Sequence, residues 1–342
     1  MTTQLDCSIG IKKETVYGTG VTVDQFLEFT TESLDRKATY VQGKGMRVGA
    51  RVARADRRYL GKEVSEGAIS LEAASKGLGI LLNAALGTVT STVVVGQTPA
   101  VYQQVHTPAT TDPLNSYTIQ KGIPPLGGGV TTPHTFTGAQ CKSIEISAKA
   151  GDIVEISTDW TAREVATATA YAAPAYPAGV ELFAFVHGSI CIGGTVTGPT
   201  TTAIAAGGTA VANIADFSIK WDNGLDDGGY NLGGAGKRAR KAVAGIAGLS
   251  GKFTAEYDST VLRDAYLAQT DLSLLLTFTN PATIGTNAKP VLQILVPVIN
   301  LEGGLPSANG GGVITQSIDF TGLDNLTSPP LTVVYVTTDT AV

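Results

Sequence analysis

Histidine is the side chain best suited to proton transfer and metal binding near neutral pH, and the sequence contains His106, His134 and His187. None of the three has a candidate nucleophile or a cluster of metal-binding side chains beside it in the sequence. A catalytic triad or a zinc site needs several such groups to converge on one point. We therefore expect no catalytic residue, no metal site, no cofactor and no enzymatic activity.

A glycine-rich segment, Gly233-Gly-Ala-Gly-Lys237, is similar to loops that bind phosphate groups. The Walker motif requires a glycine five residues before Gly236 and a serine or threonine after the lysine. Those two positions hold Asn231 and Arg238. The segment does not match the motif, and we interpret it as a flexible basic loop.

Basic residues gather in two connections of an otherwise acidic chain. The first group is Arg47, Arg51, Arg54, Arg57 and Arg58, and the second is Lys237, Arg238, Arg240 and Lys241. The net charge is nevertheless negative, with 24 Lys and Arg against 29 Asp and Glu (24 − 29 = −5). Tight binding of nucleic acid requires a basic surface that releases counterions. We therefore expect no such binding, although DNA could pass close to the protein.

The composition indicates a protein whose surface is largely covered by partners. Charged residues form 15% of the sequence and hydrophobic residues 43%, whereas the surface of a soluble monomer normally carries more charge. No run of about 18 apolar residues could cross a membrane, and the first residues lack the basic start and apolar core of a secretory signal. Cys7, Cys141 and Cys191 are far apart, so we expect buried, reduced thiols rather than a disulfide or a metal site.

The clearest structural pattern lies in residues 61–87. Ile69 and Leu71 alternate with Ser70 and Glu72, which predicts a half-buried strand. Apolar residues then recur three or four positions apart as far as Gly87, which predicts a short amphipathic helix directly after the strand. A weaker copy of this strand and helix lies at residues 251–267.

Two matched motifs indicate an internal duplication. Residues 67–72 and 251–256 share a glycine, an apolar residue two positions later, a hydroxyl at the third and a glutamate at the fifth. Residues 153–160 and 313–320 share a β-branched start, then serine, aspartate and an aromatic residue at the fourth, sixth and seventh positions. The alternative is a chance resemblance between β-rich segments.

The duplication predicts two mainly β domains, at residues 1–165 and 180–342, joined by an Ala-, Thr-, Tyr- and Pro-rich linker at 166–179. The matched motifs are 90 residues apart in the first half (Gly67 to Ser157) and 66 in the second (Gly251 to Ser317). The first domain would therefore carry an insertion of 24 residues (90 − 66 = 24), which we place in the Pro- and Thr-rich residues 88–138. The same domain would begin with an extended N-terminal segment, residues 1–28.

These features resemble the major tail tube proteins of long-tailed, siphovirus-type bacteriophages. The segments that carry the resemblance are Ile9-Gly-Ile-Lys-Lys-Glu-Thr-Val-Tyr-Gly-Thr19, Phe29-Thr-Thr-Glu-Ser-Leu34, Gly67-Ala-Ile-Ser-Leu-Glu72, Lys76-Gly-Leu-Gly-Ile-Leu-Leu82 and Phe217-Ser-Ile-Lys-Trp-Asp-Asn-Gly-Leu225. The last of these places a second domain of the same kind in the second half.

The resemblance implies two tandem β-sandwich or barrel tail tube domains, each with a short flanking α-helix. It implies a structural virion protein whose inner sheets join into rings, and rings that stack into a tube through which DNA leaves the virion. Single-domain members form hexameric rings, so a two-domain chain would form a homotrimer with pseudo-six-fold symmetry. The implied partners are further copies of the chain, the tail terminator, tape measure and tail tip proteins, and DNA that passes without specific binding, but no membrane. Assembly of the tail would take place in the host cytoplasm.

The resemblance also suggests a role for the basic connections, residues 43–61 and 223–248, in contacts between subunits or between rings. Their alternative role is that of ordinary solvated loops. For the whole chain, the alternatives are another virion surface or decoration protein, and a carbohydrate-binding β-module. Carbohydrate sites usually expose aromatic platforms, whereas only two tryptophans occur here and aromatic residues make up 6%.

Overall fold

The computed structural model describes residues 3–49, 51–111, 114–211, 213–303, 305–306 and 312–340. This part of the chain is mainly β with two short α-helices, as predicted, and its strands pair antiparallel. The first half contains η1 (Gln4–Asp6), β1 (Ser8–Lys13), β2 (Gln25–Leu27), β3 (Phe29–Glu32), β4 (Asp35–Gln42), η2 (Ala55–Arg57), β5 (Arg58–Glu72), α1 (Gly79–Leu86), β6 (Gly87–Val94), β7 (Val101–Pro108), β8 (Tyr117–Ile123), β9 (Thr132–Lys149), β10 (Glu155–Ala162) and β11 (Glu164–Ala166). The second half contains η3 (Phe185–His187), β12 (Gly188–Ile192), β13 (Val196–Thr197), β14 (Ala206–Gly207), β15 (Ile214–Asp222), β16 (Gly248–Glu256), α2 (Val261–Ala268), β17 (Leu272–Thr279), β18 (Val291–Gly303), β19 (Thr315–Gly322) and β20 (Thr332–Thr337).

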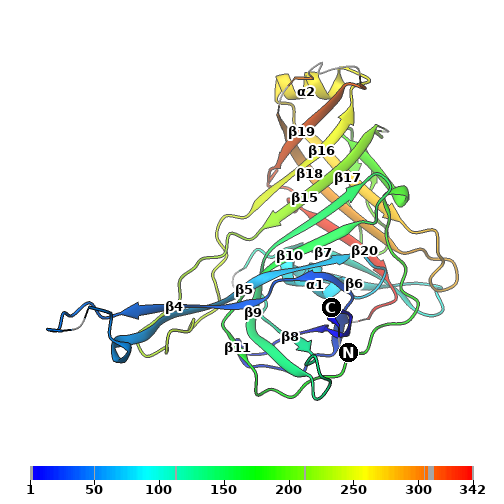
Figure 1. Cartoon of the computed structure of the whole chain (residues 1–342). Helices are drawn as coiled ribbons and strands as arrows, with labels where there is room; N and C mark the ends of the chain where they lie inside the picture. The colour runs from blue at the N-terminus through cyan, green and yellow to red at the C-terminus, as the bar shows by residue number, and fades with distance from the viewer. Residues whose placement is uncertain are drawn as a thin grey trace.

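One long sheet runs through both halves of the molecule (Figure 1). Its strand order is β4–β5–β10–β9–β15–β16–β19–β18. The two halves meet where β9 pairs with β15, from Lys149 opposite Asp216 to Ser143 opposite Asp222. Side chains alternate along these strands, so one face of the sheet is apolar and buried and the other is polar.

A second layer packs on the apolar face of the long sheet. It consists of β2, β1, β8 and the start of β9 in the first half, and of β12, β17, the start of β18 and β20 in the second. The core of the first half includes Trp160 and Tyr117, whose rings meet edge to face at 5.9 Å. Phe253 and Phe320, with ring centres 6.1 Å apart, lie in the core of the second. The two-layered arrangement agrees with the β-sandwich that the resemblance implied.

The predicted strand and helix of residues 61–87 are present, but two details of the prediction are wrong. The helix α1 begins at Gly79 rather than directly after β5, although it ends at Gly87 in the left-handed conformation as expected. All eight residues of α1 are buried, so the helix is not amphipathic. It contacts β9 as well as the β6–β7 hairpin, which leaves no face for solvent.

The helix α2 in the second half is amphipathic, as predicted. Leu262, Ala265 and Tyr266 pack against the core, whereas Asp264 is exposed to solvent together with the apolar Val261 and Leu267. No hairpin like β6–β7 follows α2, because β17 begins at Leu272.

The matched motifs of the two halves occupy the same places in the sheet. Gly67 lies opposite Trp160, and Gly251 lies opposite Phe320. The hydroxyl residues that follow these glycines also share a register, Ser70 with Ser157 and Thr254 with Ser317. The corresponding strands β3 and β15 have a register shift at the same point, between Phe29 and Thr31 and between Ile214 and Asp216.

The correspondence extends to segments that the sequence analysis did not match. The 3-10 turns η1 and η3 each lead into a strand, with Ser8-Ile-Gly-Ile11 in one half and Ser189-Ile-Cys-Ile192 in the other. Ile11 pairs with Ile119 of β8, and Ile192 with Leu274 of β17. Of the predicted insertion at residues 88–138, β6 and β7 have no counterpart in the second half, whereas β8 and β9 correspond to β17 and β18.

The counterpart glycines explain why the repeat begins with this residue. A Cβ on Gly67 would collide with the Ser33 carbonyl oxygen, and one on Gly251 with the Ser218 carbonyl oxygen and the Phe320 ring. We predict that Gly67→Ala and Gly251→Ala each lower the free energy of unfolding by about 1–3 kcal/mol, because the neighbouring backbone must shift.

The matched control is Gly127→Ala in the β8–β9 connection, where no atom lies within 4 Å of the added Cβ. Its expected effect is within about 0.5 kcal/mol of zero. Urea denaturation of the three variants measures the difference, and equal stabilities would contradict the close approach at Gly67 and Gly251.

Candidate functional site

The polar face of the long sheet runs across both halves of the chain. Acidic side chains outnumber basic ones on it among the described residues. The acids are Asp35, Glu66, Glu72, Glu145, Glu155, Asp159, Asp216, Asp222, Glu256, Glu302 and Asp319, and the lysines are Lys37, Lys142, Lys149, Lys220 and Lys252. The remaining positions are mostly serine and threonine, and Ser70 and Ser157 are hydrogen-bonded at 3.2 Å. This polar sheet face therefore presents carboxylates and small hydroxyl groups.

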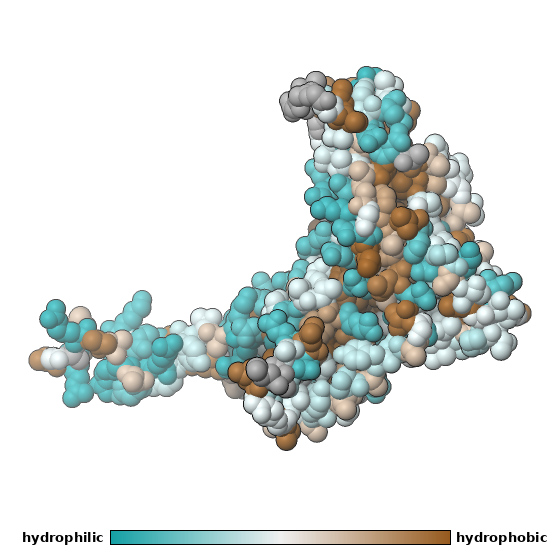
Figure 2. Space-filling model, turned by 45° about the vertical axis from the view of Figure 1, so that its right-hand side comes forward, coloured by the Kyte–Doolittle hydropathy of each residue, from teal (hydrophilic) through white to brown (hydrophobic). Residues whose placement is uncertain are grey.

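A shallow hollow crosses the junction of the two halves on the polar sheet face. Glu145 and Glu155 from the first half and Asp216 from the second are among the residues that line it, with Lys149 and Lys252 beside them. Figure 2 shows the molecule as two limbs at an angle, with hydrophilic residues along the inner side of the upright limb. A surface of this charge repels the phosphate backbone of nucleic acid rather than binding it.

The arm, which we define as residues 38–66, projects from the body of the molecule on the left of Figure 1. It is the hairpin of β4 and β5 with its connection, and it exposes several apolar side chains: Val41, Met46, Val48, Val52 and Tyr59. Several exposed apolar side chains on one projection indicate a surface that a partner covers.

The first basic cluster of the sequence analysis lies on the arm. Arg47 and Arg51 form no ion pair with the described residues. Arg54 forms a two-pronged ion pair with Asp56, the backbone oxygen of Arg57 accepts the Gly43 N–H at 2.9 Å, and the Arg58 guanidinium lies 4.6 Å from the centre of the Tyr40 ring. These residues lie on one projection but do not converge on a single point.

The base of the arm is held by a partly buried ion pair. Arg36 donates to Glu63 at 2.8 Å, and the Glu63 side chain is only 5% exposed. The hydrogen bond from Arg36 lowers the pKa of Glu63. The pair therefore stabilises the fold above the ordinary pKa of a glutamate, and this contribution is lost as the pH falls through the lowered pKa.

The second basic cluster lies on the bridging loop, which we define as residues 223–247 and which crosses from the second half onto the first. Lys237 forms an ion pair with Glu164 of β11, and Lys241 donates to the Leu114 carbonyl at 3.0 Å. Arg238 is 4% exposed and stacks on Tyr230. Arg240 holds Asp226 through two hydrogen bonds and lowers the pKa of that carboxyl. These four basic side chains are thus engaged inside the chain.

Two amide side chains that the sequence analysis did not single out anchor the bridging loop. Gln140 of β9 exchanges hydrogen bonds with the backbone of Ala242, accepting its N–H at 2.7 Å. Asn223 donates to the carbonyl oxygens of Ala85 and Cys141. Gln140 belongs to no sequence motif, and Asn223 lies in the segment 217–225 without a role assigned to it from the sequence. The roles of both follow from the packing of the loop on the first half.

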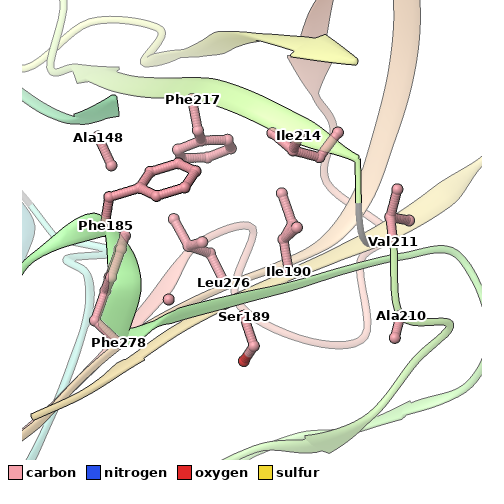
Figure 3. Close-up of a pocket in the computed structure, with 11 residues that line it drawn as sticks. Ala148, Phe185, Ser189, Ile190, Ala210, Val211, Ile214, Phe217, Leu276 and Phe278 are labelled. Atoms are coloured by element: carbon pink, nitrogen blue, oxygen red, sulfur yellow. The ribbon is translucent and has the colours of Figure 1, made fainter. Parts of the chain in front are cut away.

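An apolar cavity of about 320 Å³ lies in the second half (Figure 3). Phe185, Phe217 and Phe278 lie along it, and the hydroxyl of Ser189 points away from the ring cluster. The lining offers no pair of groups that could act as acid, base or nucleophile.

The same place in the first half is occupied by an ion pair. The registers make Glu32 the counterpart of Phe217, because the two lie opposite the counterpart residues Ile69 and Phe253. Glu32 binds Lys121 at 3.2 Å, and both side chains are largely buried.

The histidines occupy separate structural positions. His106 is buried, and burial lowers its pKa to about 3, while His187 accepts the Ala184 N–H. Within the described ranges, no group of three or more His, Cys, Asp or Glu side chains could hold a metal ion. Cys141 is buried as expected, whereas Cys7 and Cys191 are half-buried. Neither α-helix is long and apolar enough to span a bilayer, nor is any other helix in the described part of the chain.

Both tryptophans lie in the core rather than on the surface. Trp160 is 1% exposed and Trp221 is 7% exposed. Neither can supply the exposed platform on which carbohydrate-binding modules stack sugars, which weakens that alternative.

The two-layered β architecture, with one long sheet through both halves and a polar face on that sheet, defines the class as a mainly β protein. The family described as phage tail tube protein matches residues 4–322, and the chain belongs to this family. It is therefore a structural component of a phage tail, and the family implies assembly with copies of itself into a tube. No curated protein matches the chain.

The charge of the polar sheet face can be tested by reversal. We predict that the triple variant Glu145→Lys, Glu155→Lys, Asp216→Lys binds duplex DNA about tenfold more tightly than a matched triple variant, because three cations then face one phosphate backbone. The matched variant carries Glu28→Lys, Glu181→Lys and Asp227→Lys, which change the net charge equally on residues outside this face.

Fluorescence anisotropy at several salt concentrations provides the measurement, with a steeper salt dependence expected for the first variant. Strong DNA binding by the unaltered protein at physiological salt, or equal binding by the two variants, would contradict the prediction.

Proposed function

We propose that this chain forms the tail tube of a siphovirus-type bacteriophage, with three copies in each ring and rings that stack around a channel for DNA. The observation that carries the proposal is the pairing of β9 with β15, which joins two repeats edge to edge in one sheet. The family match to phage tail tube proteins supports it.

The two ends of the long sheet have free edges in the single chain. Among the described residues, β4 pairs only with β5, and residues 300–303 of β18 pair only with β19. Unpaired edges are templates for further strands. If β18 of one copy pairs with β3 and β4 of the next, as β9 pairs with β15 inside the chain, the repeats continue in a head-to-tail ring.

The ring of three follows from the two repeats. A head-to-tail contact closes into a ring when its rotation divides a full turn, and it otherwise produces an open filament. Six repeats, as in the hexameric rings of single-domain family members, correspond to three copies of a chain that carries two. The homotrimer then has pseudo-six-fold symmetry, and residues 1–165 and 180–342 are its two tube domains.

The polar sheet face would line the channel in this ring. Its carboxylates and hydroxyl groups would keep the DNA backbone mobile during ejection, since cations that could hold phosphate are in the minority. The tail terminator, tape measure and tail tip proteins would contact the ends or the channel of the tube, and the tail would assemble in the host cytoplasm.

The internal junction also predicts the register between copies. Ser143 lies opposite Asp222 in the chain. The counterpart of Ser143 is Glu302, since both face an aspartate of the motif, and the counterpart of Asp222 is Lys37. Glu302 of one copy would therefore lie opposite Lys37 of the next.

A charge exchange tests this register. Lys37→Glu and Glu302→Lys should each raise the critical concentration for assembly about two- to fivefold, the value of one cross-strand charge pair. The double variant should recover part of the loss, because the charges at 37 and 302 are again opposite, while the internal ion pair of Lys37 with Glu66 stays broken. Light scattering against concentration measures the effect, and a double variant worse than both single variants would rule out the register.

The proposed function is tested by negative-stain electron microscopy of the purified, concentrated protein. We expect tubes or rings with an open centre, and three-fold class averages in end views. A decoration protein would not polymerise alone, so compact monomers at every concentration would contradict the proposal and favour that alternative.

A further inference from the structure

The bridging loop provides a pattern for a second contact between copies, apart from the sheet edges. Its residues reach back from the second repeat onto the first. Gly236 accepts the Glu63 N–H at 2.8 Å, and the Tyr230 hydroxyl donates to the Glu63 carbonyl. With the bonds of Asn223 and Gln140, these contacts fasten the loop along one side of the first repeat.

The arm is the counterpart of the bridging loop in the first repeat. The arm contains the connection from β4 to β5, and the bridging loop is the connection from β15 to β16. The arm has 29 residues (38–66) where the second repeat has 28 (223–250). The matched glycines Gly67 and Gly251 are 184 positions apart (251 − 67 = 184). At the same offset, Arg54 and Arg57 of the arm correspond to Arg238 and Lys241 of the bridging loop. The bridging loop rests on the first repeat and on the base of the arm at Glu63, whereas the outer part of the arm projects beyond these contacts (Figure 1).

We propose that the arm docks on the second repeat of the neighbouring copy in the same ring, as the bridging loop docks on the first repeat within the chain. This inference rests on the proposed ring. It goes further because it assigns the docking surface and places the contact within a ring rather than between rings.

An unsatisfied polar atom marks the docking surface. Leu301 lies opposite Phe320 as Cys141 lies opposite Trp160, so Asn300 is the counterpart of Gln140. In the chain the Gln140 side-chain oxygen accepts the Ala242 N–H. The Oδ1 of Asn300 is buried and has no hydrogen-bond partner among the described residues. A buried acceptor without a partner costs free energy, which the backbone of an incoming arm would recover.

The incoming backbone is identified by the same correspondence. Ala242 of the bridging loop corresponds to Arg58 of the arm (242 − 184 = 58). The amide side chain of Asn300 donates to Asp271 at 3.2 Å, so a carboxylate lies beside the position that this basic residue would reach. At this position the Arg58 N–H would donate to Asn300, and the Arg58 guanidinium would lie near the Asp271 carboxylate.

Exposed apolar side chains also occupy counterpart positions. Lys62 of the arm lies over the Tyr230 ring, 4.4 Å from its centre. At the same offset, Lys62 corresponds to Ile246 and Tyr230 corresponds to Met46. Ile246 is 98% exposed, and Met46 is fully exposed. The contact between copies that corresponds to this cation–π contact would therefore be apolar. It would remove the side chains of Met46 and Ile246 from water.

Disulfide trapping tests the proposal in assembled material. The double variant Met46→Cys, Ile246→Cys should form a covalent oligomer in oxidised tubes that ends at three chains on a non-reducing gel, because the ring closes. The two single variants and the unaltered protein, with Cys7, Cys141 and Cys191, are the controls and should remain monomeric. A ladder that continues past three would place the contact between rings and overturn the proposal, as would tubes without cross-links.

A second variant avoids dependence on cross-linking chemistry. Ile246→Asp changes an exposed residue and should leave the fold intact while raising the critical concentration about tenfold or more. The matched control is Val130→Asp in the β8–β9 connection, which is 89% exposed and should assemble normally. Normal assembly of Ile246→Asp would overturn the inference, whereas failure of the unaltered protein to form rings or tubes would instead contradict the proposed function.

Discussion

The backbone N–H and C=O groups of β9 must be paired along both edges, because this strand lies in the middle of a sheet that spans the two halves. β10 pairs with one edge, and β15 of the second half pairs with the other. The inner layers of the two halves therefore form one hydrogen-bonded surface. At the two ends of that surface, the outer edges of β4 and of residues 300–303 of β18 have no partner strand among the described residues. We propose that strands of further copies pair with them.

The two repeats keep the same strand registers but differ in how their surfaces are covered. In the first repeat, the β6–β7 hairpin covers α1. The strand β7 also pairs with β20 in the outer layer of the second repeat. In the second, α2 keeps an exposed face, and an apolar cavity replaces the Glu32–Lys121 ion pair. Conserved backbone pairing with variable side chains is expected where hydrogen bonding sets the geometry and packing adapts to it.

Charge is divided between the polar sheet face and the two connections that leave it. The sheet face is acidic, whereas the arm and the bridging loop hold most of the clustered arginines and lysines. The bridging loop packs on the first half, and its cations bind carboxylates, a carbonyl group and a tyrosine ring. Ordering of a glycine-rich loop costs conformational entropy, and these contacts offset that cost.

The sequence by itself determined the mainly β class, the strand and helix within residues 61–87 and their copy at 251–267, and the matched motifs that share one register. These depend on local alternation of polar and apolar residues and on turn glycines, which are visible along the chain. The family resemblance, and with it the basic residues of the arm and bridging loop, was also accessible from short motifs. The burial of α1, the strand that joins the two halves, and the roles of Asn223, Gln140 and Asn300 were decided only by the tertiary structure. Each depends on which segments meet across a long sequence separation, and a single amide side chain or a covered helix leaves no periodic signal in the sequence.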